Sequence, residues 1–175
     1  MNFKIYSLKN VNSTNDVAIR KIKQGKLSGI ITAQKQKKGR GRHGNKWVSI
    51  KGNLFVSIFY QIKKDFSIKS ITLQNCLMLK KILSKFVSKK ISIKAPNDLM
   101  IENKKFCGIL QETFIFNDKK YIIIGIGVNI SKSPNIAKYE ATHLSSHNNK
   151  IDKMVVFKKI KKYYEKKLNC LKSNN

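Results

Sequence analysis

The feature that most constrains the fold is a set of apolar segments joined by short turns in the second half of the chain. They are residues 91–94, 99–101, 105–116 and 121–130. Their β-branched and aromatic side chains are typical of strands. The turn at residues 102–104 is too short for a crossover helix, so the strands it joins must pair antiparallel. Pro96 interrupts regular pairing between the first two of these strands, residues 91–94 and 99–101.

The rest of the chain alternates between strand-like and helix-like spacing of apolar residues. Strands are expected at residues 3–8, 29–33 and 53–62. Helices are expected from the capping residues 13–15 to about residue 24, and at residues 68–87 and 151–171. This order predicts an α+β fold, a mixed and largely antiparallel sheet with helices packed on it. Without repeats or a separating linker, residues 1–175 are expected to form a single domain.

The net charge of +28 comes from lysines spread along the whole chain. Nucleic-acid-binding proteins gather such charge on one face, so a basic nucleic-acid-binding module is kept as the minority interpretation. The three cysteines form no metal-ligand pattern, and the N-terminus has no apolar signal stretch, which favours a cytoplasmic protein. No membrane span is expected, because the longest apolar run, residues 121–126, is far below the about 20 residues that a bilayer requires.

One glycine-rich stretch, residues 36–47, holds two of the three arginines, Arg40 and Arg42, and the only tryptophan, Trp47. Guanidinium groups bind carboxylate and phosphate oxygens in a bidentate way that lysine cannot match. Interleaved glycines let the backbone approach a ligand closely. Taken alone, the stretch is either a mobile loop that closes over a small anionic substrate or a basic surface turn.

Two other segments also allow both a structural and a functional interpretation when each is taken alone. Residues 13–15, Ser-Thr-Asn, are good helix caps, but a helix start can also hold a polar ligand. Gly125 and Gly127 within a strand indicate either close packing or a place where a ligand lies on the sheet.

Taken together, four short segments resemble the catalytic domain of biotin–protein ligases, in the order and at the spacing of that family. They are residues 13–15 (STN), 39–47 (GRGRHGNKW), 94–98 with 105–110 (KAPND and KFCGIL), and 125–130 (GIGVNI). The resemblance covers residues 6–171, nearly the whole chain. It implies the fold of the class II aminoacyl-tRNA synthetase and biotin synthetase catalytic domains.

The resemblance implies that biotin and ATP, with Mg²⁺, form biotinyl-5′-AMP, and that biotin then passes to a lysine of a biotin carboxyl carrier protein. It assigns catalysis to Arg42 and Lys105. It assigns biotin binding to Ser13, Thr14, Asn15, Gln36, Gly39, Arg40, Gly41, Arg42, Trp47 and Lys105. It assigns ATP binding to Arg40, Arg42, Lys94, Asn97, Asp98, Lys105 and Asn129, and Mg²⁺ to Asp98.

The chain departs from the family pattern in three ways. Ala95 stands where tryptophan is usual, and neither an N-terminal helix-turn-helix nor a C-terminal β-barrel is expected, so specific DNA binding is not expected either. The resemblance leaves a homodimer open. Lipoate– and octanoate–protein ligases share the fold and the transfer of an acyl group to lysine, but their arginine/glycine loops differ, so they rank second.

Overall fold

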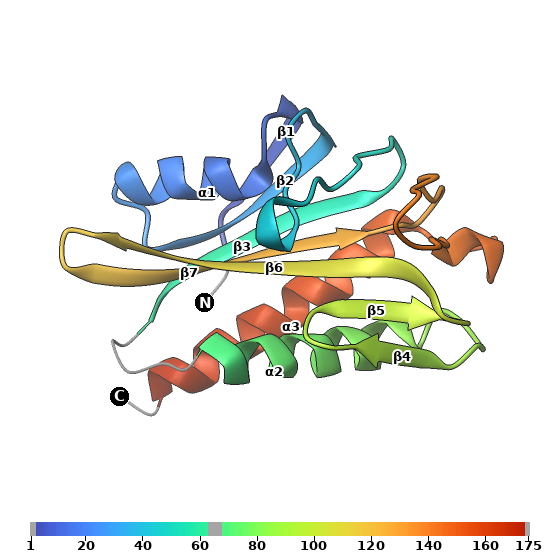
Figure 1. Ribbon diagram of the computed structural model, residues 1–175. Coiled ribbons are helices and arrows are strands. Elements are labelled where there is room, and N and C mark those ends of the chain that lie inside the picture. Colours follow the sequence, from blue (N-terminus) through green and yellow to red (C-terminus); the bar gives the residue numbers. More distant parts are fainter. Residues whose placement is uncertain (1–2, 63–67, 174–175) are drawn as a thin grey trace.

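The computed structural model describes residues 3–62 and 68–173, in which seven strands form one sheet (Figure 1). The strands are β1 Ile5–Val11, β2 Ser28–Gln36, β3 Leu54–Ile62, β4 Ile91–Lys94, β5 Asp98–Ile101, β6 Lys104–Phe116 and β7 Lys119–Val128. Their order is β1-β2-β3-β7-β6-β5-β4. Only β1 and β2 pair parallel, and the other pairs are antiparallel. The predicted α+β fold with a mixed, largely antiparallel sheet is confirmed.

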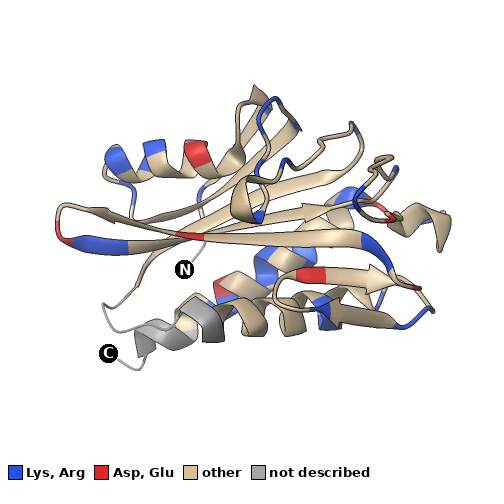
Figure 2. Ribbon diagram, in the orientation of Figure 1, with Lys and Arg blue, Asp and Glu red and all other residues tan. Residues whose placement is uncertain are grey.

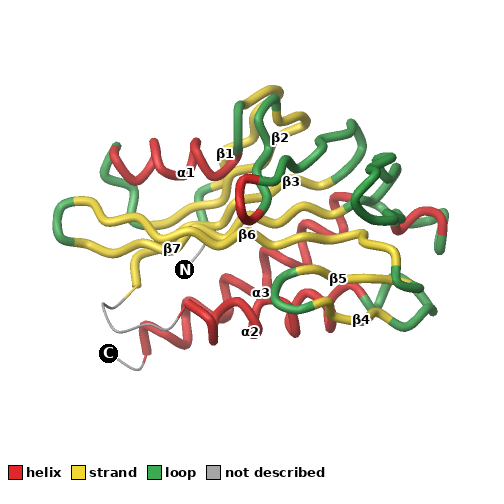
Figure 3. Tube along the Cα trace, in the orientation of Figure 1, coloured by secondary structure: helices red, strands yellow, loops and turns green. Residues whose placement is uncertain are grey.

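Three helices cover the two faces of the sheet (Figures 1 and 3). Helix α1, Thr14–Lys23, lies on one face, while α2, Ile68–Leu83, and α3, Lys153–Ser173, lie on the other. A large apolar cluster fills the space between the sheet and the α2/α3 layer, and a smaller cluster lies under α1. Cys76 and Met78 on α2 are buried in the large cluster. None of the described helices is long and apolar enough to cross a membrane.

The main differences from the sequence-based boundaries lie at the ends of elements. Strand β1 continues to Val11, because it pairs in parallel register with β2 as far as Gln36. Helix α2 ends at Leu83, although Val87 beyond it stays buried, so the apolar spacing outlasts the helix. Helix α3 begins at Lys153, because the carboxylate of Asp152 accepts the N–H of Met154 at 2.6 Å and caps the helix.

The end of β7 is set by one side chain. The backbone leaves the ladder after Val128, and the side-chain oxygen of Asn53 accepts the N–H groups of Ile130, Ser131 and Lys132 at 3.0–3.2 Å. Asn53 is 1% exposed, and its amide oxygen provides the partner that the buried N–H of Ile130 would otherwise lack. This contact directs the following loop back toward the start of β6.

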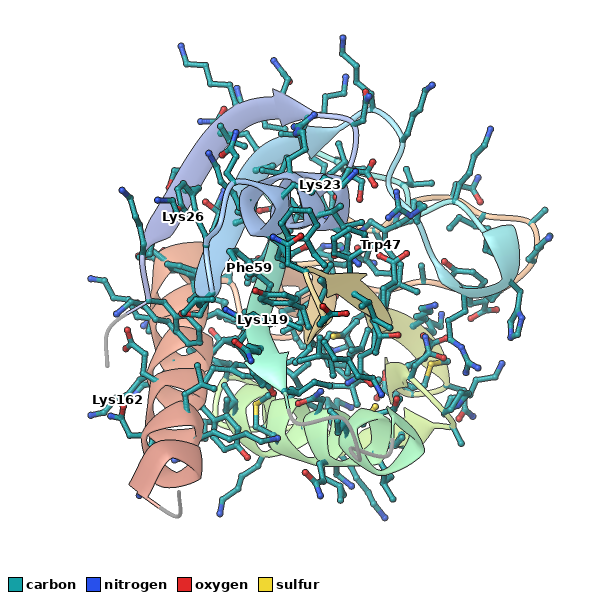
Figure 4. The ribbon with its side chains drawn as sticks, turned by 90° about the vertical axis from the view of Figure 1, so that its left-hand side faces the viewer. Lys23, Lys26, Trp47, Phe59, Lys119 and Lys162 are labelled. Carbon is teal, nitrogen blue, oxygen red and sulfur yellow. The ribbon has the colours of Figure 1, made fainter. Side chains whose placement is uncertain are left out.

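The basic residues do not gather on one layer. Figure 2 shows Lys and Arg on the helices of both faces and on loops at both ends of the sheet. In Figure 4 lysine side chains point outward around the molecule, among them Lys26, which follows α1, and Lys162 on α3. This spread agrees with lysines that solvate the surface and gives no support to a dedicated nucleic-acid face.

Candidate active site

A cavity of about 790 Å³ lies where segments distant in sequence converge, on the face of the sheet that carries α1. Its size is typical of a site for a small molecule or cofactor. Its lining includes Ser13, Thr14, Asn15, Gln36, Lys94, Ala95, Asn97, Asp98, Lys105, Gly108, Gly125, Gly127, Tyr139 and the loop from Arg40 to Val48. The structure therefore brings most of the site residues predicted from the sequence to one cavity.

Part of the cavity wall is formed by strands β6 and β7, against which the indole of Trp47 lies. Gly108 of β6 and Gly127 of β7 lie directly opposite each other in the ladder. A Cβ atom at Gly127 would lie 2.4 Å from the indole, and one at Gly108 would lie 2.7 Å from it. Only glycine at both positions lets the ring approach the backbone this closely. The indole N–H is buried and has no hydrogen-bond partner among the described residues.

A buried hydrogen-bond network forms a second part of the wall, where α1 begins. The backbone N–H and hydroxyl of Thr14 both donate to the side-chain oxygen of Gln36, at 2.8 and 3.0 Å. The hydroxyl of Ser57 donates to Thr14 Oγ1 at 2.7 Å and also to the amide oxygen of Asn15. Ser13 is the N-cap of α1, and its hydroxyl accepts the N–H of Asn15 at 3.2 Å. The predicted cap is therefore present, and it also lines the cavity.

Arg40 is held by two carboxylates. Its guanidinium donates to Asp16 on α1 and to both oxygens of Glu112 on β6, the latter at 3.1 and 3.2 Å. Burial lowers the pKa of Arg40, but the hydrogen bonds and charges of the two carboxylates outweigh it and raise the pKa above its ordinary value. Arg40 is therefore a fixed cation whose charge is already balanced by protein groups.

Arg42 differs from Arg40 although the two lie only two residues apart. It lines the cavity, and its guanidinium makes no hydrogen bond or ion pair within the part of the chain that the structure describes. The surrounding loop is closed by backbone contacts, from Gly41 N to Asn45 O at 2.6 Å and from Trp47 N to Gly39 O at 2.9 Å. This turn presents Arg42 as a guanidinium without a protein counterion.

Lys105 also lines the site, with a carboxylate and two aromatic rings around it. Its ammonium is 2.8 Å from Asp98 Oδ2. It also lies 5.6 Å from the ring centre of Trp47 and 5.0 Å from that of Tyr139. Both members of the ion pair are mostly buried, with side chains 16% and 20% exposed. Asp98 Oδ1 is buried and has no hydrogen-bond partner among the described residues.

The remaining predicted residues have different surroundings. Asn97 lines the cavity, and its amide nitrogen donates to the carbonyl of Ile109 at 3.0 Å. Lys94 is exposed at the edge of the cavity. Asn129 is 2% exposed and is not part of the lining, and its amide bonds to the carbonyl of Thr142 and to Asn53. Its predicted contact with ATP stays a prediction.

Three residues of the site were not singled out by sequence reasoning: Asp16, Ser57 and Glu112. Ser57 looked like an ordinary polar residue in a buried strand. Asp16 and Glu112 carry one signal in the sequence, because acidic residues are rare in this chain, which has only nine of them. Which cation they approach could not be read from the sequence, since 37 basic residues were available.

Comparisons with known proteins agree with this geometry. The chain matches the biotin/lipoate A/B protein ligase family over residues 7–129. It is 33% identical over 124 residues to the bifunctional ligase/repressor BirA of Escherichia coli, a match that covers 69% of this chain and 39% of that protein. The chain thus spans about two fifths of the length of this relative.

Solved structures show the same likeness in three dimensions. The biotin protein ligase of Aquifex aeolicus in complex with biotin and ATP is 31% identical with a TM-score of 0.78, over 95% of this chain and 70% of that one. The biotin protein ligase of Leishmania major in complex with biotinyl-5-AMP is 28% identical with a TM-score of 0.68, over 82% of this chain and 64% of that one. The chain belongs to the biotin/lipoate A/B protein ligase family, and the resemblance to biotin protein ligase catalytic domains is confirmed.

Proposed function

We propose that this chain is an ATP-dependent biotin–protein ligase that makes biotinyl-5′-AMP and transfers biotin to a lysine of a biotin carboxyl carrier protein. The observation that carries the proposal is one cavity lined by two chemically different sets of groups. Thr14 and Gln36 offer neutral hydrogen-bonding groups, and Arg42 and Lys105 offer two cations. Biotin has the matching polarity, with a neutral ureido ring at one end and a carboxylate at the other.

In the first step, a biotin carboxylate oxygen attacks the α-phosphorus of ATP, and the bond to the bridging oxygen of pyrophosphate breaks. Both reactants are anions, so the site must offset their repulsion and the charge of the transition state. We assign this role to Arg42, which has no counterion among the described residues, and to Lys105. The carboxylate of Asp98 and the rings of Trp47 and Tyr139 limit the positions of the Lys105 ammonium.

The acidic residues present suit a magnesium ion that is bound mainly by nucleotide phosphates. Mg²⁺ with ATP typically takes one or two carboxylates together with phosphate oxygens and water. Asp98 offers one buried carboxylate oxygen without a hydrogen-bond partner among the described residues, and no described cluster of three acidic, cysteine or histidine side chains could hold a metal alone. We propose that Asp98 Oδ1 holds the ion, which would neutralise phosphate charge when bound.

In the second step, the lysine amine of the carrier protein attacks the carbonyl carbon of biotinyl-5′-AMP. An amide bond forms, the bond to the phosphate oxygen breaks, and AMP leaves with a proton lost from the amine. The mixed anhydride is also open to water, so the site must exclude solvent until the carrier arrives. The loop at residues 39–47, with Trp47 lying against the sheet, is suited to this exclusion.

The test is to incubate the purified chain with Mg-ATP and either biotin or lipoate, and to identify the acyl adenylate by mass spectrometry. A biotin carboxyl carrier domain, and the same domain with its acceptor lysine changed to arginine, should then be added. We expect biotinyl-5′-AMP and a biotinylated lysine on the unaltered domain only. Lipoyl-AMP without biotinyl-AMP would place the chain with the lipoate ligases and refute the proposal.

A further inference from the structure

The carboxylates of Asp16 and Glu112 converge on Arg40 from two different elements. Asp16 lies in the first turn of α1, and Glu112 lies in the middle of β6. They are 24 and 72 residues away from Arg40 in the sequence. Two of only nine acidic residues therefore meet at one of only three arginines, in a chain where lysine supplies nearly all other positive charge. Two carboxylates at one guanidinium indicate a defined role for Arg40.

The local charge argues against Arg40 as the group that binds an anionic substrate. One guanidinium between two carboxylates gives the cluster a net charge of −1, and the hydrogen bonds to Asp16 and Glu112 use both of its terminal nitrogens. An incoming carboxylate or phosphate would meet a donor group already engaged by two anions of the protein. Neither Asp16 nor Glu112 lines the cavity, although Arg40 does, so the two carboxylates hold Arg40 from behind.

The same cluster is bonded to the polar wall of the cavity. Glu112 Oε2, which accepts from Arg40, also accepts the amide N–H of Asn15 at 2.6 Å. The oxygen of the Asn15 amide accepts from Ser57, and Ser57 donates to Thr14 as well. A continuous series of side-chain contacts therefore joins the loop to the turn at which α1 begins.

We propose that Asp16 and Glu112 are positioning residues that hold the loop of residues 39–47 closed through Arg40, so that Arg42 and Trp47 face the ligand. Arg40 is then the anchor of the loop, and Arg42 is its ligand-binding guanidinium. The inference rests on the proposed function for its catalytic consequences, but the closed state of the loop can be measured without any substrate.

The experiment uses Trp47, the only tryptophan in the chain, as an intrinsic reporter of the loop. Acrylamide, a neutral quencher, is titrated against tryptophan fluorescence in the unaltered chain and in Asp16→Asn, Glu112→Gln and the double variant. These substitutions keep the size of each side chain and remove its charge. Because two partly exposed charged contacts are lost, we expect the open fraction of the loop to rise about tenfold in the double variant, with stronger quenching and red-shifted emission.

The matched control is Glu102→Gln, which removes an ion pair of similar length, 2.8 Å to Lys89, away from the cavity. Acrylamide should quench the tryptophan fluorescence of this variant to the same extent as that of the unaltered chain. Asp16→Glu keeps the negative charge and should restore most of the protection. Unchanged quenching in the double variant, at unchanged stability to urea, overturns the proposal; if the double variant does not fold, the two single variants decide in the same way.

A second measurement separates an anchor from a catalytic group. If the anchor only sets the population of the closed loop, saturating ligand restores closure. The KM for biotin should then rise by the factor by which the closed fraction falls in the quenching experiment, while kcat changes less than about twofold. A fall in kcat at constant KM would instead assign the two carboxylates to the chemical step and overturn the proposal. If the unaltered chain binds no biotin but the quenching result is as expected, the proposed function fails and the anchor stands.

Discussion

The contact between Trp47 and the paired glycines makes Gly127→Ala an informative perturbation. The substitution adds one methyl group to β7, in extended backbone that alanine adopts without strain. That methyl carbon would lie 2.4 Å from Cε2 and 2.5 Å from Cζ2 of the indole, whereas ordinary contact begins at 3.4 Å. The indole must therefore retreat by about 1 Å or leave the sheet with its loop.

The two consequences of this displacement differ in size. Alanine loses less conformational freedom on folding than glycine, which stabilises the fold by about 0.5–1 kcal/mol. The displaced indole exposes apolar area, and about 40 Å² of it costs about 1 kcal/mol. The free energy of unfolding should therefore change by less than about 1 kcal/mol. A site displaced by about 1 Å commonly loses about 100-fold in function, so the affinity for biotin should fall by about two orders of magnitude.

The assay combines urea unfolding, tryptophan emission and calorimetric titration with biotin. We expect nearly unchanged unfolding, red-shifted emission from Trp47 and about 100-fold weaker binding. A double-mutant cycle with Trp47→Ala then tests the physical cause. Once the indole is absent, the added methyl group has nothing to displace, so Gly127→Ala should have little further effect on binding. Additive losses, or unchanged emission in the single variant, would refute the steric argument.

Three further predictions follow from individual side chains. Arg42→Lys should lower the rate of biotinyl-5′-AMP formation at least about tenfold while leaving the unfolding midpoint in urea unchanged, because only the bidentate geometry is lost; wild-type activity would contradict its proposed role. Burial raises the pKa of Cys76 to about 11 and that of Cys107 further, so iodoacetamide at pH 8 should label neither thiol before unfolding, as mass spectrometry can verify. Burial lowers the pKa of His143 below its ordinary 6.5, so the imidazole binds a proton more readily in the unfolded chain than in the folded one. The contribution of His143 to the free energy of unfolding is therefore complete above about pH 6.5 and declines below it. His143→Asn should flatten that part of the pH profile of urea unfolding.

The predictions from sequence succeeded where a local pattern has a direct structural consequence. The β-branched and aromatic runs and short turns of residues 91–130 specify antiparallel strands, and the structure has them in sequence as β4 to β7. Boundaries were less accurate because remote contacts set them. The end of β7, for example, depends on the amide of Asn53, more than 70 residues earlier.

The candidate site, like the fold, was predicted from the sequence only in part. The sequence alone drew attention to Arg40, Arg42 and Trp47, because arginine and tryptophan are rare in this chain and stand together among glycines. It could not reveal that Trp47 lies on Gly108 and Gly127, since that contact requires β6 and β7 to be paired in one particular register.

The clearest limit concerns the two arginines of the loop. In the sequence they are equivalent, each preceded by glycine and two residues apart, and both were assigned to the ligand. The tertiary structure distinguishes them, because helix α1 and strand β6 bring Asp16 and Glu112 to Arg40 alone. Residue types and local spacing therefore determined that this chain carries a cationic, glycine-rich loop. Only the packing of distant elements decided which guanidinium is neutralised by the protein and which one faces the cavity with no counterion in the described part of the chain.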